Sequence, residues 1–190
     1  MTAAEPAPRP GPPVVLVEGE SDAVVVRVVL AARGTEAEVR AMGGVTNLAR
    51  HLEDLGGPGP DVLVLVDAGE VRFAAGALRR HGVRAETTEE LTWHGVFACE
   101  RDLEDVLIGA VGPTVVVDVL AGMAELAGFR TFAQMPQWRD QPVADQLHRF
   151  AGAGSGRKAR LAARLAERLD PWDLPPPLDA LVQAVEGAAR

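Results

Sequence analysis

The segment VVLVEGESD, residues 14–22, decides how the rest of the chain is interpreted. Its first four residues, Val14–Val17, are all apolar and mostly β-branched, which is typical of a short buried strand. The apolar run ends at Glu18, so a carboxylate is expected at the carboxyl end of that strand. Open α/β sheets bind their ligands at this end of their strands. Because an acid directly after a strand is not needed for helix capping, Glu18 is the first candidate for a functional residue.

A helix is expected directly after this strand. Residues 22–33, DAVVVRVVLAAR, are long enough and apolar enough on one face, with Ser21 or Asp22 as the cap. A helix N-terminus attracts acidic side chains, so capping is one explanation for Asp22 and Glu20. The alternative is that Asp22 adds a second carboxylate beside Glu18.

The remaining chain alternates expected strands and helices. Strands are expected at 38–42, 61–66 and 95–99, and helices at 46–55 and 71–81. The segment 61–66, DVLVLV, is continuously apolar, as in a strand that is buried on both faces. Strand–helix units with short connections predict an α/β fold, with a mainly parallel sheet of about four strands flanked by helices. All strands of such a sheet end at one edge.

Three regions are expected along the chain. Residues 1–13 are rich in proline and are expected to form a disordered leader, residues 14–112 the α/β core, and residues 113–190 a mainly helical C-terminal extension packed on the core. No apolar run approaches the roughly 18 residues that a membrane span needs, so no membrane association is expected. The single cysteine, Cys99, excludes an internal disulfide, and the expected location is cytoplasmic.

The composition limits the function. A formal charge of −8 argues against a broadly basic protein that coats nucleic acid. It is compatible with an enzyme that gathers acids around metal ions and meets nucleic acid through a local basic patch. His94 and His148 have no partners at the spacing of metal ligands and are expected to be ordinary histidines. The chain has no tyrosine, which excludes topoisomerase chemistry unless a partner supplies that nucleophile.

Acidic residues follow the expected strands. Asp67 comes directly after the DVLVLV strand, and Asp102 and Glu104 follow the last strand. Together with Glu18, they are expected to converge at one edge of the sheet. Clustered carboxylates repel one another unless a cation lies among them, and such hard oxygen ligands favour Mg²⁺ or Mn²⁺ over Zn²⁺. The alternative is that these acids are ordinary loop and helix-start residues.

Lys158 is unusual because it is the single lysine among 19 basic residues. Wherever a bare positive charge is enough, this chain uses arginine, so a lone lysine indicates a need for a compact ammonium group, such as contact with a phosphate oxygen. The alternative is that this lysine is present by chance. The surrounding segment 152–160, GAGSGRKAR, is not a P-loop, because Arg157 precedes the lysine and Ala159 follows it.

A helix with a basic face is expected after Gly156. Arg157, Arg160 and Arg164 follow one line along this helix, beside a stripe of leucines. This pattern predicts contact with a nucleic-acid backbone. The alternative is a solvated face that balances nearby acids.

Four segments together resemble the TOPRIM domain of nucleases of the OLD (overcoming lysogenization defect) type, in the free-standing form without an ATPase domain. They are VLVEGESD, the glycine pair at 43–44, VLVDAGE and ACERDLEDVLI, and they occur in the order that this family shows. The resemblance covers about residues 14–186. It implies a Rossmann-like TOPRIM fold with a helical C-terminal appendage, and a metal-dependent cleavage of phosphodiester bonds.

The resemblance also implies a set of site residues. Glu18 and Lys158 are the expected catalytic residues. The expected metal ligands are Glu18, Asp22, Asp67, Glu70, Asp102 and Glu104. One position departs from the family pattern, because Gly69 stands where the second aspartate of an Asp-x-Asp pair is expected. Either Glu70 supplies that ligand or one metal site is weakened.

The expected function is that of a nuclease or phosphoryl-transfer enzyme that uses one or two Mg²⁺ or Mn²⁺ ions on nucleic acid, with DNA as the expected substrate and a separate ATPase as a partner. Glu18 would bind a metal ion or act as the general base, and Lys158 would stabilise charge on the phosphate. Two other classes stay open. One is a TOPRIM binding module with weakened catalysis that works with a partner ATPase, and the other is a signalling domain phosphorylated on Asp67.

Overall fold

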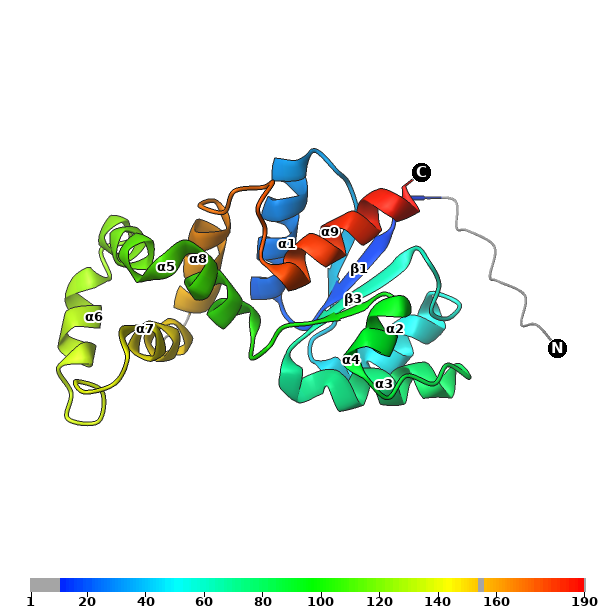
Figure 1. Cartoon of the computed structure of the whole chain (residues 1–190), viewed down its shortest axis with the longest axis horizontal. Helices are drawn as coiled ribbons and strands as arrows, with labels where there is room; N and C mark the ends of the chain where they lie inside the picture. Colours follow the sequence, from blue (N-terminus) through cyan, green and yellow to red (C-terminus); the bar gives the residue numbers. More distant parts are fainter. Residues whose placement is uncertain (1–10, 154–155, 190) are drawn as a thin grey trace.

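The computed structural model describes residues 11–153 and 156–189. Its centre is one parallel sheet with the strand order β2-β1-β3-β4 (Figure 1). The strands are β1 (Val14–Val17), β2 (Glu38–Ala41), β3 (Val62–Val66) and β4 (Val96–Ala98). The predicted α/β fold with a parallel sheet is therefore confirmed.

The register of the sheet places all strand ends at one edge. Val17 pairs with Ala41 at the end of β2, and Val66 pairs with Ala98 at the end of β4. Because the strands are parallel, the residues that follow them emerge on the same side. Pro13, predicted to be in the disordered leader, already belongs to this fold, because its carbonyl accepts a hydrogen bond from the N–H of Glu38 (2.8 Å). Residues 1–10 of that leader lie outside the described part.

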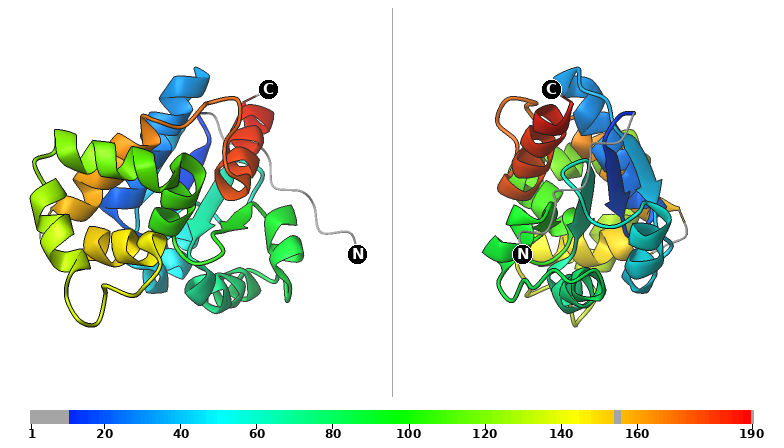
Figure 2. Two further views of the ribbon diagram at one scale, coloured as in Figure 1. Left: turned by 60° about the vertical axis from the view of Figure 1, so that its left-hand side comes forward. Right: turned by 90° about the vertical axis from the view of Figure 1, so that its right-hand side faces the viewer.

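Helices cover both faces of the sheet (Figures 1 and 2). Val15 and Val17 pack on one face against α1, α5, α8 and α9, whereas Val14 and Leu16 pack on the other against α2, α3 and α4. This alternation is the period of a strand that is buried on both sides. The helices are α1 (Glu20–Arg33), η1 (Val45–Asn47), α2 (Leu48–Asp54), η2 (Ala68–Glu70), α3 (Val71–Arg80), α4 (Thr88–Trp93), α5 (Leu103–Gly122), α6 (Leu126–Ala133), α7 (Val143–Gly152), α8 (Arg157–Ala166) and α9 (Pro176–Ala188).

Helix α1 begins earlier than predicted. Its N-cap is Gly19, rather than Ser21 or Asp22. Asp22 lies in the first turn, where its Oδ2 accepts a hydrogen bond from the N–H of Gly19 (2.9 Å). The backbone of Gly19 can enter the helix without a side-chain cap because the acid three residues later closes the turn.

Helix α5 contains a kink at the position where the sequence predicts the end of the core. Gly112 has φ 78° and ψ 156°, and Pro113 follows it. Leu103–Gly122 as a whole is long and apolar enough, by length and composition, to cross a membrane. The kink divides it into two arms of roughly 15 Å each, and a membrane core is about 30 Å thick.

The helical extension meets the α/β core chiefly through α8 and α9. Helices α5, α6 and α7 form a lobe beside the sheet (Figure 1). Within this lobe, Phe129 and Phe132 pack against Phe150. Helix α8 joins this lobe to α1, and α9 returns to lie against β3 and β4. Helix α7 also contacts the loop after β4, where Arg101 lies 3.3 Å from Asp145, and one continuous hydrophobic cluster links sheet and lobe.

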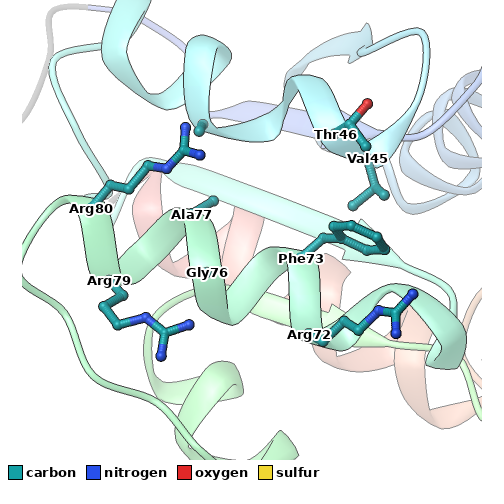
Figure 3. Close-up of a pocket in the computed structure, with 9 residues that line it drawn as sticks. Val45, Thr46, Arg72, Phe73, Gly76, Ala77, Arg79 and Arg80 are labelled. Atoms are coloured by element: carbon teal, nitrogen blue, oxygen red, sulfur yellow. The ribbon is translucent and has the colours of Figure 1, made fainter.

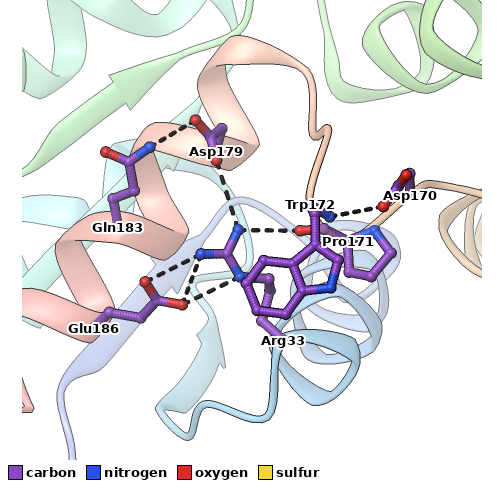
Figure 4. Close-up of polar contacts among 7 residues, drawn as sticks. All are labelled: Arg33, Asp170, Pro171, Trp172, Asp179, Gln183 and Glu186. Atoms are coloured by element: carbon purple, nitrogen blue, oxygen red, sulfur yellow. Dashed lines mark hydrogen bonds and ion pairs between the residues drawn. The ribbon is translucent and has the colours of Figure 1, made fainter.

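Arg33, at the end of α1, holds α9 in place (Figure 4). Its guanidinium donates to Glu186 (2.9 Å) and to the carbonyl of Pro171 (3.0 Å), and Asp179 lies 3.8 Å away. The indole ring of Trp172 packs over it, with 4.5 Å between the guanidinium carbon and the ring centre. The side chain of Arg33 is only 10% exposed, and its charge is fully matched.

Candidate metal centre at the carboxyl edge of the sheet

The two loops after β1 and β2 hold the start of the site together. Gly43 and Gly44 have φ 68° and 113°, values that favour glycine. They allow the chain to turn back, so that the N–H of Gly44 donates to the carbonyl of Glu18 (3.1 Å). Glu18 is thereby placed at the end of the central strand, as the sequence predicts.

The acids after the strands are close enough to influence one another. Burial, followed by the negative charges of Asp22, Asp102, Glu70 and Glu104, raises the pKa of Asp67 to about 7. These residues come from α1, the loop after β4, η2 and α5, which are distant in the sequence. The structure therefore brings the predicted acids together at one edge of the sheet.

Glu70 belongs to this group of acids. Burial, together with the negative charge of Glu18, raises the pKa of Glu70 to about 7. Within the described residues, Glu70 Oε2 is buried and has no hydrogen-bond partner. Gly69 is exposed, and a Cβ added at this position would meet no atom within 4 Å. Glu70, rather than position 69, thus supplies a carboxylate to the edge.

Lys158 reaches the acids from α8. Its ammonium nitrogen lies 3.2 Å from Glu104 Oε2, and the carboxylate is 9% exposed whereas the lysine side chain is 47% exposed. Burial lowers the pKa of Lys158, but the charges of Glu104, Asp22 and Asp67 outweigh burial and raise it. Lys158 is therefore a charged ammonium group with one side on the acids and the other open to a ligand.

His148 is a member of the site that the sequence did not reveal. Its Nε2 lies 2.6 Å from Asp102 Oδ2, while Asp102 Oδ1 accepts from the N–H of Asp105 (2.9 Å) and so caps α5. His148 was expected to be an ordinary histidine, and its contact with Asp102 was not foreseen. Because 46 residues separate it from Asp102, no local spacing could have indicated the pair.

The three arginines predicted to bind nucleic acid are engaged with acids. Arg157 is the most deeply held, because it pairs with Glu125 (3.1 Å) and donates to the carbonyls of Phe150 and Ala153. Arg160 also pairs with Glu125, at 3.3 Å. The remaining member, Arg164, pairs with Glu167 at 3.1 Å. Their role in binding nucleic acid stays a prediction.

The possible ligand atoms at the edge are of the type that hard divalent cations prefer. They are carboxylates, which Mg²⁺ and Mn²⁺ prefer, and the unpartnered Oε2 of Glu70 is one of them. In residues 11–153 and 156–189, however, no three Asp, Glu, His or Cys side chains are arranged to hold a metal ion as they stand. Several of these side chains would have to turn toward one another to share an ion.

Comparisons with known proteins agree on the fold. No family model matches the chain, and no curated protein matches its sequence. The C-terminal region of the Burkholderia pseudomallei OLD protein is similar in structure, with a TM-score of 0.67 and 19% identity over 93% of this chain and 98% of that one. The C-terminal region of the Xanthomonas campestris pv. campestris OLD protein has a TM-score of 0.65 and 22% identity, over 93% and 95%. The chain therefore has the fold of the C-terminal region of OLD proteins, and the resemblance found in its sequence is confirmed at the level of the fold.

Proposed function

We propose that the protein is a Mg²⁺- or Mn²⁺-dependent enzyme that cleaves phosphodiester bonds in nucleic acid. The observation that carries this proposal is the excess of negative charge at the carboxyl edge. Asp22, Asp67, Glu70 and Glu104 all have a raised pKa, chiefly because of burial, and the negative charges of neighbouring acids, Glu18 and Asp102 included, contribute to the rise. Lys158 alone does not balance them, and a divalent cation would supply the missing positive charge.

The proposed metal ligands are the acids of this edge. Asp67 and Glu70 follow β3, Asp22 lies in the first turn of α1, and Asp102 and Glu104 stand at the start of α5. Bound magnesium or manganese would polarise the phosphate and make a water molecule more acidic. The carboxylates would turn toward a bound ion, because its positive charge would offset their mutual repulsion.

Two residues of the chain act on the substrate directly in this proposal. Glu18 accepts a proton from the attacking water, whose oxygen then forms the bond to phosphorus. The bond from phosphorus to the leaving oxygen breaks, and that oxygen takes a proton from solvent. Lys158 donates an N–H to a non-bridging oxygen, where negative charge grows.

Two side chains position these groups. Glu104 holds the ammonium group of Lys158, and His148 holds the carboxylate of Asp102. A ligand or base that is fixed in this way loses less conformational freedom when the substrate binds. Arg160 and Arg164 are proposed contacts to the DNA backbone, since their ion pairs lie at the surface and are weak enough for a phosphate to replace.

The test is cleavage of single-stranded, nicked and supercoiled DNA by the purified protein with Mg²⁺ or Mn²⁺. Asp67→Ala should abolish cleavage. The matched control is Asp173→Ala, which removes an exposed acid of the loop before α9. Cleavage that persists in Asp67→Ala or in EDTA would contradict the proposal. Absence of both cleavage and ion binding would favour the binding module, and labelling of Asp67 by acetyl phosphate would favour the signalling domain.

A further inference from the structure

A second charged surface lies on the face of the sheet opposite to α8. It is an open pocket of about 590 Å³ between α2 and α3 (Figure 3). Three arginines line it, Arg72, Arg79 and Arg80, together with Phe73, over an apolar floor that includes Val45. Among the residues that the structure describes, no acidic side chain lines this pocket.

The arginines of this pocket are free, unlike those of α8. Within the described chain, none of Arg72, Arg79 and Arg80 has an acidic side chain within 4.0 Å, and all three are exposed. Helix α3, VRFAAGALRR, contains no acid, although the whole chain carries a charge of −8. A basic surface kept free of acids in an acidic protein fits an anionic partner.

Phe73 gives this surface an aromatic contact. It is 39% exposed, and its ring points across the pocket toward Val45 and Thr46 (Figure 3). The guanidinium of Arg72 lies over one side of the ring, 4.8 Å from its centre. Free nucleobases stack on such rings, whereas the bases of a duplex are covered by their neighbours. The combination of free arginines and an exposed ring therefore favours a single strand.

The pocket leads away from the proposed metal centre. Glu70, which faces the acids, directly precedes α3, and Arg72 lies two residues further on. Arg79 and Arg80 stand at the far end of this helix, about 15 Å along its axis. A strand that leaves the acidic edge along α3 would pass the three arginines in turn.

We propose that this pocket binds a single-stranded stretch of the nucleic-acid substrate. Arg72, Arg79 and Arg80 contact its phosphates, and Phe73 stacks on one of its bases. The inference deepens the proposed function and rests on it, because it assigns the path of the strand on one side of the cleavage site.

The test measures binding of a fluorescent oligothymidine and of a duplex of equal length, in EDTA, so that no cleavage occurs. Arg79→Gln/Arg80→Gln should weaken binding of the single strand at least ten-fold and reduce the slope of log affinity against log salt by about 1.4. The matched control is Arg130→Gln/Arg149→Gln, which removes the same charge from exposed arginines of α6 and α7. Phe73→Leu should weaken binding of the single strand about ten-fold and leave binding of the duplex unchanged.

The outcomes separate this inference from the proposed function. Equal losses of affinity for the single strand in the two double variants would overturn the inference, because the total charge of the protein would then explain binding. Equal affinity of the pocket for polyglutamate would also overturn it, in favour of an acidic protein partner. If the wild type cleaves DNA but Arg79→Gln/Arg80→Gln binds normally, the inference fails and the function stands. If neither the wild type nor Asp67→Ala cleaves DNA but Arg79→Gln/Arg80→Gln loses affinity for the single strand, the function fails and the pocket stands.

Discussion

The charged groups at the two ends of helix α1 differ in whether nearby groups balance their charge. At its C-terminal end, Arg33 is matched by Glu186, by Asp179 and by the carbonyl of Pro171. At its N-terminal end, Asp22 belongs to a group of partly buried acids that raise one another's pKa and meet a single lysine. Both groups are sheltered from water, so the balance of charge, rather than burial, distinguishes them.

The difference separates structure from function. A matched cluster is complete without a ligand and stabilises the fold that contains it. An unmatched cluster costs folding free energy, since buried like charges destabilise one another. Helices α8 and α3 repeat the contrast, because the arginines of α8 are paired and those of the α3 pocket are not. We expect substitutions in matched clusters to change stability and substitutions in unmatched ones to change binding or activity.

The largest effect in this comparison is expected at Lys158, the lysine beside the unmatched cluster. Lys158→Met should reduce cleavage at least 100-fold with the fold intact, because it removes charge that stabilises the transition state. Lys158→Arg should lose most of the activity as well, since a guanidinium is broader than an ammonium group. Initial cleavage rates measure both, with Arg168→Met, at an exposed position just beyond the same helix, as the control. Full activity of Lys158→Arg would show that the lone lysine has no special role.

The matched cluster should respond in stability instead. Arg33→Ala leaves Glu186 and Asp179 without their cation, and we expect a loss of about 2–3 kcal/mol in the free energy of unfolding. The melting temperature should fall by about 4–12 °C. Urea denaturation measures the loss, and Arg139→Ala, which breaks an exposed pair with Asp140, should cost under about 1 kcal/mol. A stable Arg33→Ala with reduced cleavage would reverse the assignment of the two clusters.

The pH dependence of stability should distinguish the clusters further. The pKa of Asp67 and that of Glu70 are raised to about 7, so the folded state binds more protons than the unfolded state between about pH 4 and pH 7. The ion-free protein should therefore lose stability as the pH rises through that window. Mg²⁺ binds the ionised acids, so it should raise the melting temperature by a few degrees more at pH 8 than at pH 6. Thermal melts with and without Mg²⁺ check this, and an equal shift at both values would argue against ion binding by these acids.

The smallest expected effect is a gain. Gly69→Asp adds the second acid of the Asp-x-Asp pattern at an exposed position with free space around it. The fold should tolerate it, with a change of under about 0.5 kcal/mol. The Mg²⁺ concentration for half-maximal cleavage should fall about three-fold, because an added carboxylate increases the charge of the ligand set. An unchanged concentration would indicate that Glu70 already supplies the ligand completely.

The sequence predicted the sheet and its acidic edge well, for a topological reason. The apolar runs that form β1 and β3 are continuous, and a parallel sheet must bring the residues after its strands to one edge. Glu18, Asp67 and Glu104 could therefore be grouped from their order alone. The short helix α4 was missed, although Thr87 and Glu90 form the capping box that marks its start.

The parts that could not be predicted depend on contacts between distant segments. His148 and Asp102 meet only because α7 folds back on the start of α5. The basic line on α8 looked free, but Glu125, outside that helix, occupies two of its arginines. The arginines of α3 look ordinary in the sequence, and only the structure shows that no acid of the described segments reaches them. Partners that are far apart in the chain leave no periodic signal.

The most direct test of the central claim is calorimetric titration of the ion-free protein with Mn²⁺, for the wild type and for Asp67→Asn. If the unmatched acids form a metal centre, the wild type should bind one or two ions per chain, with release of protons at pH 6.5, and Asp67→Asn should bind at least ten-fold more weakly. If the wild type binds no ion, or if Asp67→Asn binds Mn²⁺ with the same affinity and stoichiometry, the acidic edge is not the metal centre.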